Sequence, residues 1–144
     1  AGVAPAAASA AGPAGAVALK NRGNDLVREK KHAEAIKTYE AALAVLEKEG
    51  AGADGTQQAL FATLHANIAL CYLQQQLYRR AVDAATASIE RDATHAKAYY
   101  RRCLAYKKLR MFAEAQKDLQ ALQYCRHEMT PAEMQRLSAS LAGQ

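Results

Sequence analysis

The sequence predicts an all-α fold, a solenoid of three helical hairpins with one further helix capping its C-terminal end. Good helix formers dominate the 144-residue chain, and proline occurs only at positions 5, 13 and 131. Apolar residues recur at helical spacing between short breaks. Residues 62–95 and 96–129 align without a gap at a spacing of 34, which is typical of stacked helical repeats.

The opening segment, residues 1–15 (AGVAPAAASAAGPAG), is of low complexity, with proline and glycine interrupting the alanine. It contains almost nothing to bury, so we expect a flexible leader. The predicted helical domain then covers residues 16–142.

The three repeats are predicted at 16–49, 62–95 and 96–129. In this register Tyr72 aligns with Tyr106. The first repeat precedes the second by 46 residues, twelve more than one repeat. We place an inserted loop at about residues 49–57, within the glycine-rich stretch EKEGAGADGTQQ, because lengthening a loop costs little entropy.

Each repeat is predicted to be a pair of helices. In the first repeat the apolar spacing is helical on both sides of a break near Lys30 and Lys31. Small residues recur where the two helices must approach closely, since larger side chains would separate them. They are Gly23, Ala69 and Cys103 in the first helices, and Ala35, Ala81 and Ala115 in the second.

Residues 131–142 are predicted to form the capping helix. Thr130 is placed as its N-cap, Pro131 as its first helical residue, and Glu133 to complete a capping box. Three apolar residues share one face of this helix: Met134, Leu137 and Leu141. That face would cover the apolar edge that an open solenoid exposes.

The composition narrows the class of partner and the compartment. The formal net charge is +5, from 19 basic and 14 acidic residues, which favours an acidic partner. No apolar run approaches the roughly eighteen residues that a membrane span needs. Three cysteines (Cys71, Cys103 and Cys125) without a secretory signal favour a reducing compartment, so we expect a cytoplasmic location.

Catalytic signatures are absent from the sequence. It contains no glycine-rich phosphate loop, no GxSxG motif and no close pair of metal-ligating histidines or cysteines. The four histidines lie about a repeat apart: His32, His65, His95 and His127. We interpret them and the cysteines as surface or packing residues, and expect no enzymatic activity, no metal and no cofactor.

Over roughly residues 16–127 these repeats resemble the tetratricopeptide repeat (TPR) family, which has a glycine or alanine and then a tyrosine in its first helix, and two alanines flanking an aromatic residue in its second. The sequence departs from the family at Arg22 and Arg102, where leucine is usual, and at Ala85, where an aromatic residue is usual. We expect these departures to lower the stability of each repeat. The resemblance implies a right-handed superhelical solenoid whose concave surface is lined by the first helix of each repeat.

Five polar residues of these first helices match, in repeat phase, the carboxylate-clamp motif of TPR co-chaperones: Lys20, Asn24, Asn67, Lys97 and Arg101. The resemblance implies a ligand class, the C-terminal Glu-Glu-Val-Asp tail of the 70- and 90-kDa heat-shock chaperones. A terminal aspartate offers two carboxylates, which fixed cations and amide donors satisfy by charge-assisted hydrogen bonds.

By this analogy the terminal main-chain carboxylate is held by Lys20, Asn24 and Asn67. Lys97 takes the aspartate side chain, and Arg101 reaches the upstream part of the peptide.

Two further sets of residues flank the clamp. An aliphatic wall is expected to receive the penultimate side chain of the ligand, and its candidates are Val27, Leu70 and Leu73. Lys107 and Lys108 lie one turn and more beyond Arg101, where they would favour acidic residues further upstream in the ligand.

Other functions remain open from the sequence. A TPR scaffold recognises other partners, and such a domain also targets larger enzymes, such as a prolyl isomerase or a phosphatase. Residues 97–110 hold six basic residues and three tyrosines, as nucleic-acid-binding stripes do, but Tyr99 and Tyr106 occupy interior repeat positions. We therefore expect a monomeric domain with a protein partner, and neither nucleic acid nor membrane as a ligand.

Overall fold

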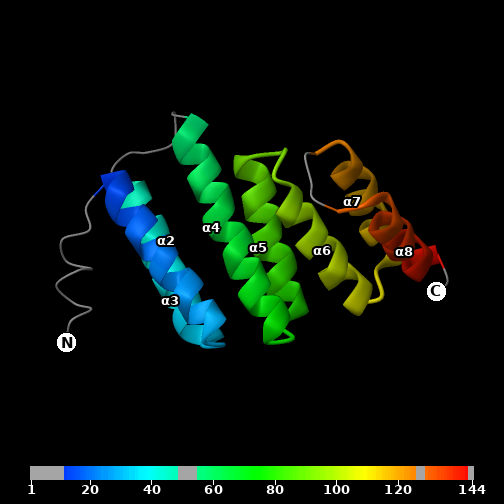
Figure 1. Cartoon of the computed structure of the whole chain (residues 1–144), viewed down its shortest axis with the longest axis horizontal. Coiled ribbons are helices and arrows are strands. Elements are labelled where there is room, and N and C mark those ends of the chain that lie inside the picture. The colour runs from blue at the N-terminus through cyan, green and yellow to red at the C-terminus, as the bar shows by residue number, and fades with distance from the viewer. Residues whose placement is uncertain (1–11, 49–54, 126–128, 143–144) are drawn as a thin grey trace.

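The computed structural model describes residues 12–48, 55–125 and 129–142, which form seven α-helices and no strand (Figure 1). The helices pack as consecutive antiparallel pairs in a single curved row. The pairs are α2 (Gly12–Arg28) with α3 (His32–Lys48), α4 (Gly55–Gln74) with α5 (Tyr78–Arg91), and α6 (Ala96–Lys108) with α7 (Phe112–Gln123). A last helix, α8 (Pro131–Ala142), packs on α7. The predicted all-α solenoid of three hairpins is confirmed.

Two helices begin earlier than the sequence patterns predicted. α2 begins at Gly12, inside the expected leader, because the proline at position 13 falls in a first turn that needs no amide hydrogen, and Ala16 is fully buried. α4 begins at Gly55, inside the expected loop, because Phe61 is buried in the core and extends the helix's packed face. Residues 1–11 and 49–54 lie outside the described part, so the rest of the leader and loop stays a prediction.

The three turns between paired helices share one backbone geometry. Lys30, Gln76 and Arg110 have φ of 62°, 64° and 62°. In each turn the amide of the following residue donates to the carbonyl five residues earlier, as Leu77 N does to the carbonyl of Tyr72 at 2.9 Å. This is the Schellman motif that ends many helices. The turns recur at steps of 46 and 34 residues, the same spacing as the predicted repeats.

Gln76→Gly is expected to raise the free energy of unfolding by about 0.5–1 kcal/mol. The left-handed conformation costs a residue with a Cβ about 1–2 kcal/mol, of which glycine's greater freedom in the unfolded chain offsets part. Urea unfolding measures the change. Gln75→Gly serves as control, because Gln75 is not among the described residues with positive φ. A destabilised Gln76→Gly would contradict the turn geometry.

The core lies between the first helices of the pairs (α2, α4 and α6) and the second helices (α3, α5 and α7), and the predicted small residues are buried in it. Ala35, Ala69, Ala81, Cys103 and Ala115 are each 0 % exposed. The remaining one, Gly23, faces the ring of Tyr39 so closely that a Cβ built on it would lie 2.4 Å from Cε1 of that ring. Close approach of the paired helices therefore explains these residue types.

The C-terminal helix has the predicted capping box. The amide of Thr130 donates to the Glu133 carboxylate at 2.7 Å, and the amide of Glu133 donates to Thr130 Oγ1 at 3.2 Å. The bond from the Thr130 amide lowers the pKa of the Glu133 carboxylate. Leu141 is buried against the C-terminal core, with Met134 and Leu137 packed beside it. α8 thus covers the end of the solenoid as predicted.

Candidate functional site

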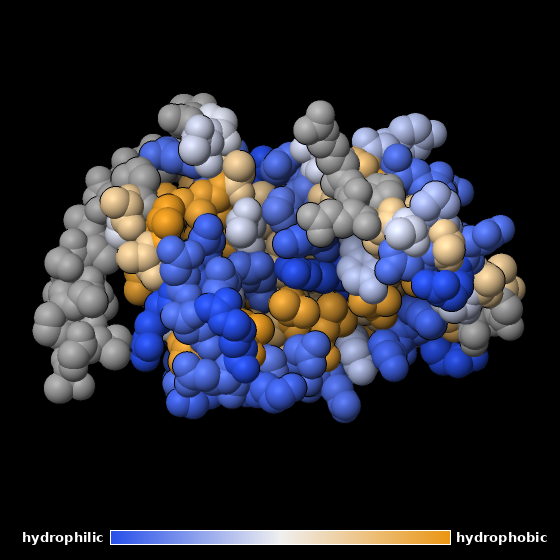
Figure 2. All heavy atoms as spheres, in the orientation of Figure 1, coloured by the Kyte–Doolittle hydropathy of each residue, from blue (hydrophilic) through white to orange (hydrophobic). Residues whose placement is uncertain are grey.

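The first helices of the three hairpins, α2, α4 and α6, lie side by side, since α4 contacts both α2 and α6. They present the surface on which the predicted clamp residues fall. Figure 2 shows a hydrophobic stretch over the central helices, bordered by hydrophilic residues.

A chain of hydrogen bonds joins three of the five predicted clamp residues across these helices. The hydroxyl of Tyr39 donates to Oδ1 of Asn24 at 2.6 Å, and Nδ2 of Asn67 donates to the same oxygen at 3.3 Å. Nη1 of Arg101 in turn lies 3.4 Å from Oδ1 of Asn67. Because Oδ1 of Asn24 accepts both bonds, the amide NH2 of Asn24 is left to donate elsewhere.

Arg101 is the most constrained of the five. Its Nη1 also donates to the backbone carbonyl of Ala66 at 2.8 Å, which fastens α6 to α4. Burial lowers the pKa of Arg101, but a guanidinium keeps its charge at neutral pH. The result is a fixed positive charge between α4 and α6, beside the amide of Asn67.

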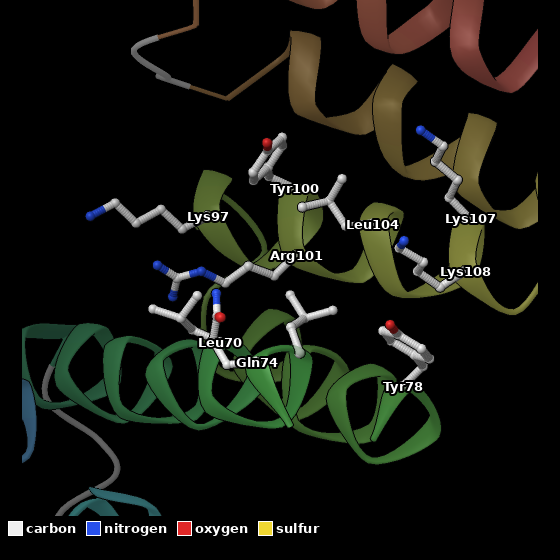
Figure 3. Close-up of a pocket in the computed structure, with 10 residues that line it drawn as sticks. Leu70, Gln74, Tyr78, Lys97, Tyr100, Arg101, Leu104, Lys107 and Lys108 are labelled. Atoms are coloured by element: carbon white, nitrogen blue, oxygen red, sulfur yellow. The ribbon is translucent and has the colours of Figure 1, made fainter. Parts of the chain in front are cut away.

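A pocket with a volume of about 460 Å³ opens between α4 and α6 (Figure 3). Leu70, Leu73 and Leu104 supply its aliphatic part. Figure 3 shows Lys97 at one end, Lys107 and Lys108 at the other, and the Arg101 guanidinium beside Leu70. The pocket thus combines an apolar floor with cations at both ends. We call this pocket, together with the clamp residues, the groove.

A second, adjoining pocket of about 290 Å³ is shared by Asn67 and Lys97. Thr63, Thr94 and His95 also line it. Burial lowers the pKa of His95, so this imidazole is neutral at physiological pH. Lys97 lines both pockets and therefore connects them, while Asn67 lines the smaller one.

Two predicted residues, Lys20 and Val27, do not line either of these pockets. Lys20 lies one turn from Asn24 on α2 and is half-buried, and within the described ranges its ammonium group makes no ion pair or hydrogen bond. Val27 packs against the N-terminal core and is not among the residues that line the larger pocket. Leu70 and Leu73 of α4 do line the larger pocket, as does Leu104 of α6, so the aliphatic wall is formed by α4 and α6.

Sequence reasoning missed Tyr78, Tyr100 and Leu104 as parts of this pocket. Leu104 could have been predicted from the sequence, because it follows Leu70 by one repeat of 34 residues. Tyr78 comes from the second helix of its repeat, so no argument from the first helices alone would have found it. Tyr39, which holds Asn24, belongs to a second helix too.

The described cysteines and histidines do not gather into a metal-binding cluster. Burial raises the pKa of Cys71 to about 11 and of Cys103 to about 12, so neither is a thiolate at neutral pH. Residues 12–48, 55–125 and 129–142 contain no cluster of three His, Cys, Asp or Glu suited to a metal ion. None of the described helices is long and apolar enough to cross a bilayer. His127 lies outside the described residues.

Comparison with known proteins shows where this architecture recurs. No protein-family model matches the chain. Protein unc-45 homolog B of Xenopus tropicalis is 35% identical over 104 residues, which are 72% of this chain and 10% of that protein. The chain thus spans about a tenth of the length of this curated relative.

Two solved structures are similar over nearly their whole length. The second TPR of Spaghetti (RPAP3), bound to the HSP90 peptide SRMEEVD, is 32% identical with a TM-score of 0.65, and the match covers 77% of this chain and 92% of that one. The second TPR domain of human RPAP3, in complex with the HSP70 peptide SGPTIEEVD, is 28% identical with a TM-score of 0.68, covering 89% and 92%.

Proposed function

The chain belongs to the tetratricopeptide repeat family, and from this premise we propose that its groove binds the acidic C-terminal tail of a 70- or 90-kDa heat-shock chaperone. The observation that carries the proposal is the hydrogen-bonded chain from Asn24 through Asn67 to Arg101, with Lys97 beside it. The two similar TPR domains of known structure hold peptides that end in EEVD.

The terminal residue of such a tail carries two carboxylates on one Cα. In this proposal Lys20 and the free NH2 of Asn24 meet the main-chain carboxylate together with Asn67, and Lys97 meets the aspartate side chain. Such charge-assisted hydrogen bonds contribute about 1.5–3 kcal/mol each. Tyr39 and Arg101 support the site by holding the two amides in place, which reduces the entropy lost on binding.

The remainder of the pocket gives the upstream peptide its environment. Leu70, Leu73 and Leu104 offer an apolar floor for an aliphatic side chain of the ligand. Lys107 and Lys108, at the far end in Figure 3, favour acidic residues that precede it. Because the cations are partly exposed, we expect affinity to fall as salt concentration rises.

Lys97→Ala is expected to weaken binding of a peptide ending in Glu-Glu-Val-Asp by about ten- to a hundredfold, the equivalent of one charge-assisted hydrogen bond. Stability should not change, because Lys97 is exposed and makes no ion pair with any described residue. Isothermal titration calorimetry measures the effect. Lys37→Ala is the matched control, an exposed lysine on α3 that does not line either pocket.

A TPR scaffold for a different partner predicts another outcome of the same experiment, namely that Lys97→Ala and Lys37→Ala capture the partner equally well. A further alternative is that this module targets a larger enzyme, such as a prolyl isomerase or a phosphatase. We place the module in the cytoplasm and expect it to act as a monomer.

A further inference from the structure

The three turns that join paired helices lie in a row along one edge of the solenoid, the lower edge in Figure 1. We define this turn edge as residues 28–34, 74–80 and 107–114. It is distinct from the clamp, which lies along the faces of α2, α4 and α6, although Lys107 and Lys108 belong to both the turn edge and the groove.

The turn edge carries the positive charge of the molecule. Its residues include eight basic and three acidic side chains, a net charge of +5, which equals the formal net charge of the whole chain. Arg28 pairs with Asp25, and Lys31 pairs with Glu29 at 3.1 Å. Six cations form no ion pair within the described ranges: Lys30, Arg79, Arg80, Lys107, Lys108 and Arg110.

Two large apolar side chains are exposed among these cations. Leu77 is 42% exposed and Met111 is 38% exposed, and they occupy equivalent positions 34 residues apart. A Schellman turn favours an apolar residue there, but Lys31 at the same place in the first turn shows that the turn forms without one. Both residues are also helix N-caps that make no side-chain capping bond. A polar cap would serve the fold better.

We propose that the turn edge binds the surface of an anionic lipid bilayer, with the cations at the headgroups and Leu77 and Met111 in the interfacial layer. The three turns lie along one edge of the solenoid, and each cation near an anionic membrane adds to the attraction. Exposed apolar side chains among unpaired cations form the kind of amphipathic surface that binds at a bilayer interface, and this combination favours lipid. Surface binding needs no membrane-spanning helix. This inference departs from the sequence-based expectation that a membrane is not a ligand.

Vesicle co-sedimentation of the whole chain tests the proposal. The chain is expected to bind vesicles that contain phosphatidylserine with phosphatidylcholine, and not to bind vesicles of phosphatidylcholine alone. High salt should dissociate it from the vesicles. Arg79→Glu with Arg110→Glu should lower the partition coefficient at least about tenfold, since one cation near such a surface accounts for roughly fivefold. Lys48→Glu with Arg22→Glu is the control, because it changes the net charge equally on exposed residues outside the turn edge.

Leu77→Asn with Met111→Asn tests the apolar contribution, because asparagine removes the apolar side chain without changing the net charge. Asparagine is a preferred N-cap, so this variant should stay folded, and it should also lose vesicle binding at least about tenfold. Neither variant pair alters a residue that lines the groove, so a failed membrane result leaves the proposed tail binding untouched. The proposal is overturned if the chain ignores phosphatidylserine at low salt, or if the control pair weakens binding as strongly. It is also overturned if the variants differ in binding to polyglutamate, an acidic protein probe, but bind phosphatidylserine vesicles equally well.

Discussion

Asp118→Ala is expected to lower the free energy of unfolding by about 3–5 kcal/mol, the usual cost of leaving a buried charge without its partner. Asp118 is 3% exposed and accepts two hydrogen bonds from Arg102, at 2.9 Å from Nε and 2.7 Å from Nη2. These bonds raise the pKa of Arg102, whose guanidinium also donates to Thr86. Chemical denaturation with circular dichroism measures the loss.

The chain contains its own control for this pair. One repeat earlier, the positions of Arg102 and Asp118 are filled by Ile68 and Ala84, both buried in the other core cluster. Arg102→Ile with Asp118→Ala should therefore recover most of the stability that Asp118→Ala loses, because an apolar pair leaves no unpaired charge. A double variant as unstable as the single one would show that the ion pair is not the cause.

Gly23→Ala is expected to destabilise the domain by about 1–3 kcal/mol and to weaken tail binding as well. The added Cβ would meet three atoms of the Tyr39 ring within 2.9 Å, and overpacking of this kind outweighs the roughly 1 kcal/mol that alanine gains in a helix. Movement of the ring also displaces the hydroxyl that holds Asn24. Thermal unfolding and peptide titration measure the two effects.

The third repeat supplies a variant that separates these effects. Its residues at the positions of Gly23 and Tyr39 are Cys103 and Leu119, both buried. Gly23→Cys with Tyr39→Leu removes the steric conflict and the hydroxyl together. We expect a folded domain that binds the tail more weakly than the unaltered chain. Full affinity in this variant would contradict the supporting role of Tyr39.

The repeat register made most of the fold predictable from the sequence. It fixed three hairpins, the small residues between them and, with the Thr130 to Glu133 capping box, the terminal helix. The starts of α2 and α4 were predicted wrongly, because tertiary burial of Ala16 and Phe61 prevailed over glycine-rich composition. Propensity and composition describe segments, whereas burial depends on neighbours that lie far away in the sequence.

Less of the candidate site than of the fold could be predicted from the sequence. Register placed Asn67, Lys97 and Arg101 on neighbouring helices, and in the structure Lys97 shares one pocket with Asn67 and the other with Arg101. It could not reveal Tyr39 beneath Asn24, because that contact joins two helices. For the same reason Arg102 looked like a destabilising replacement of leucine, whereas the structure pairs it with Asp118.

The most direct test of the account compares two peptides that end in Glu-Glu-Val-Asp, one with a free C-terminus and one amidated. The proposed clamp needs both carboxylates of the last residue, and amidation removes one of them. Calorimetry is expected to show the amidated peptide binding at least about tenfold more weakly, because one set of charge-assisted hydrogen bonds is lost. Equal affinity for the two peptides would contradict the clamp.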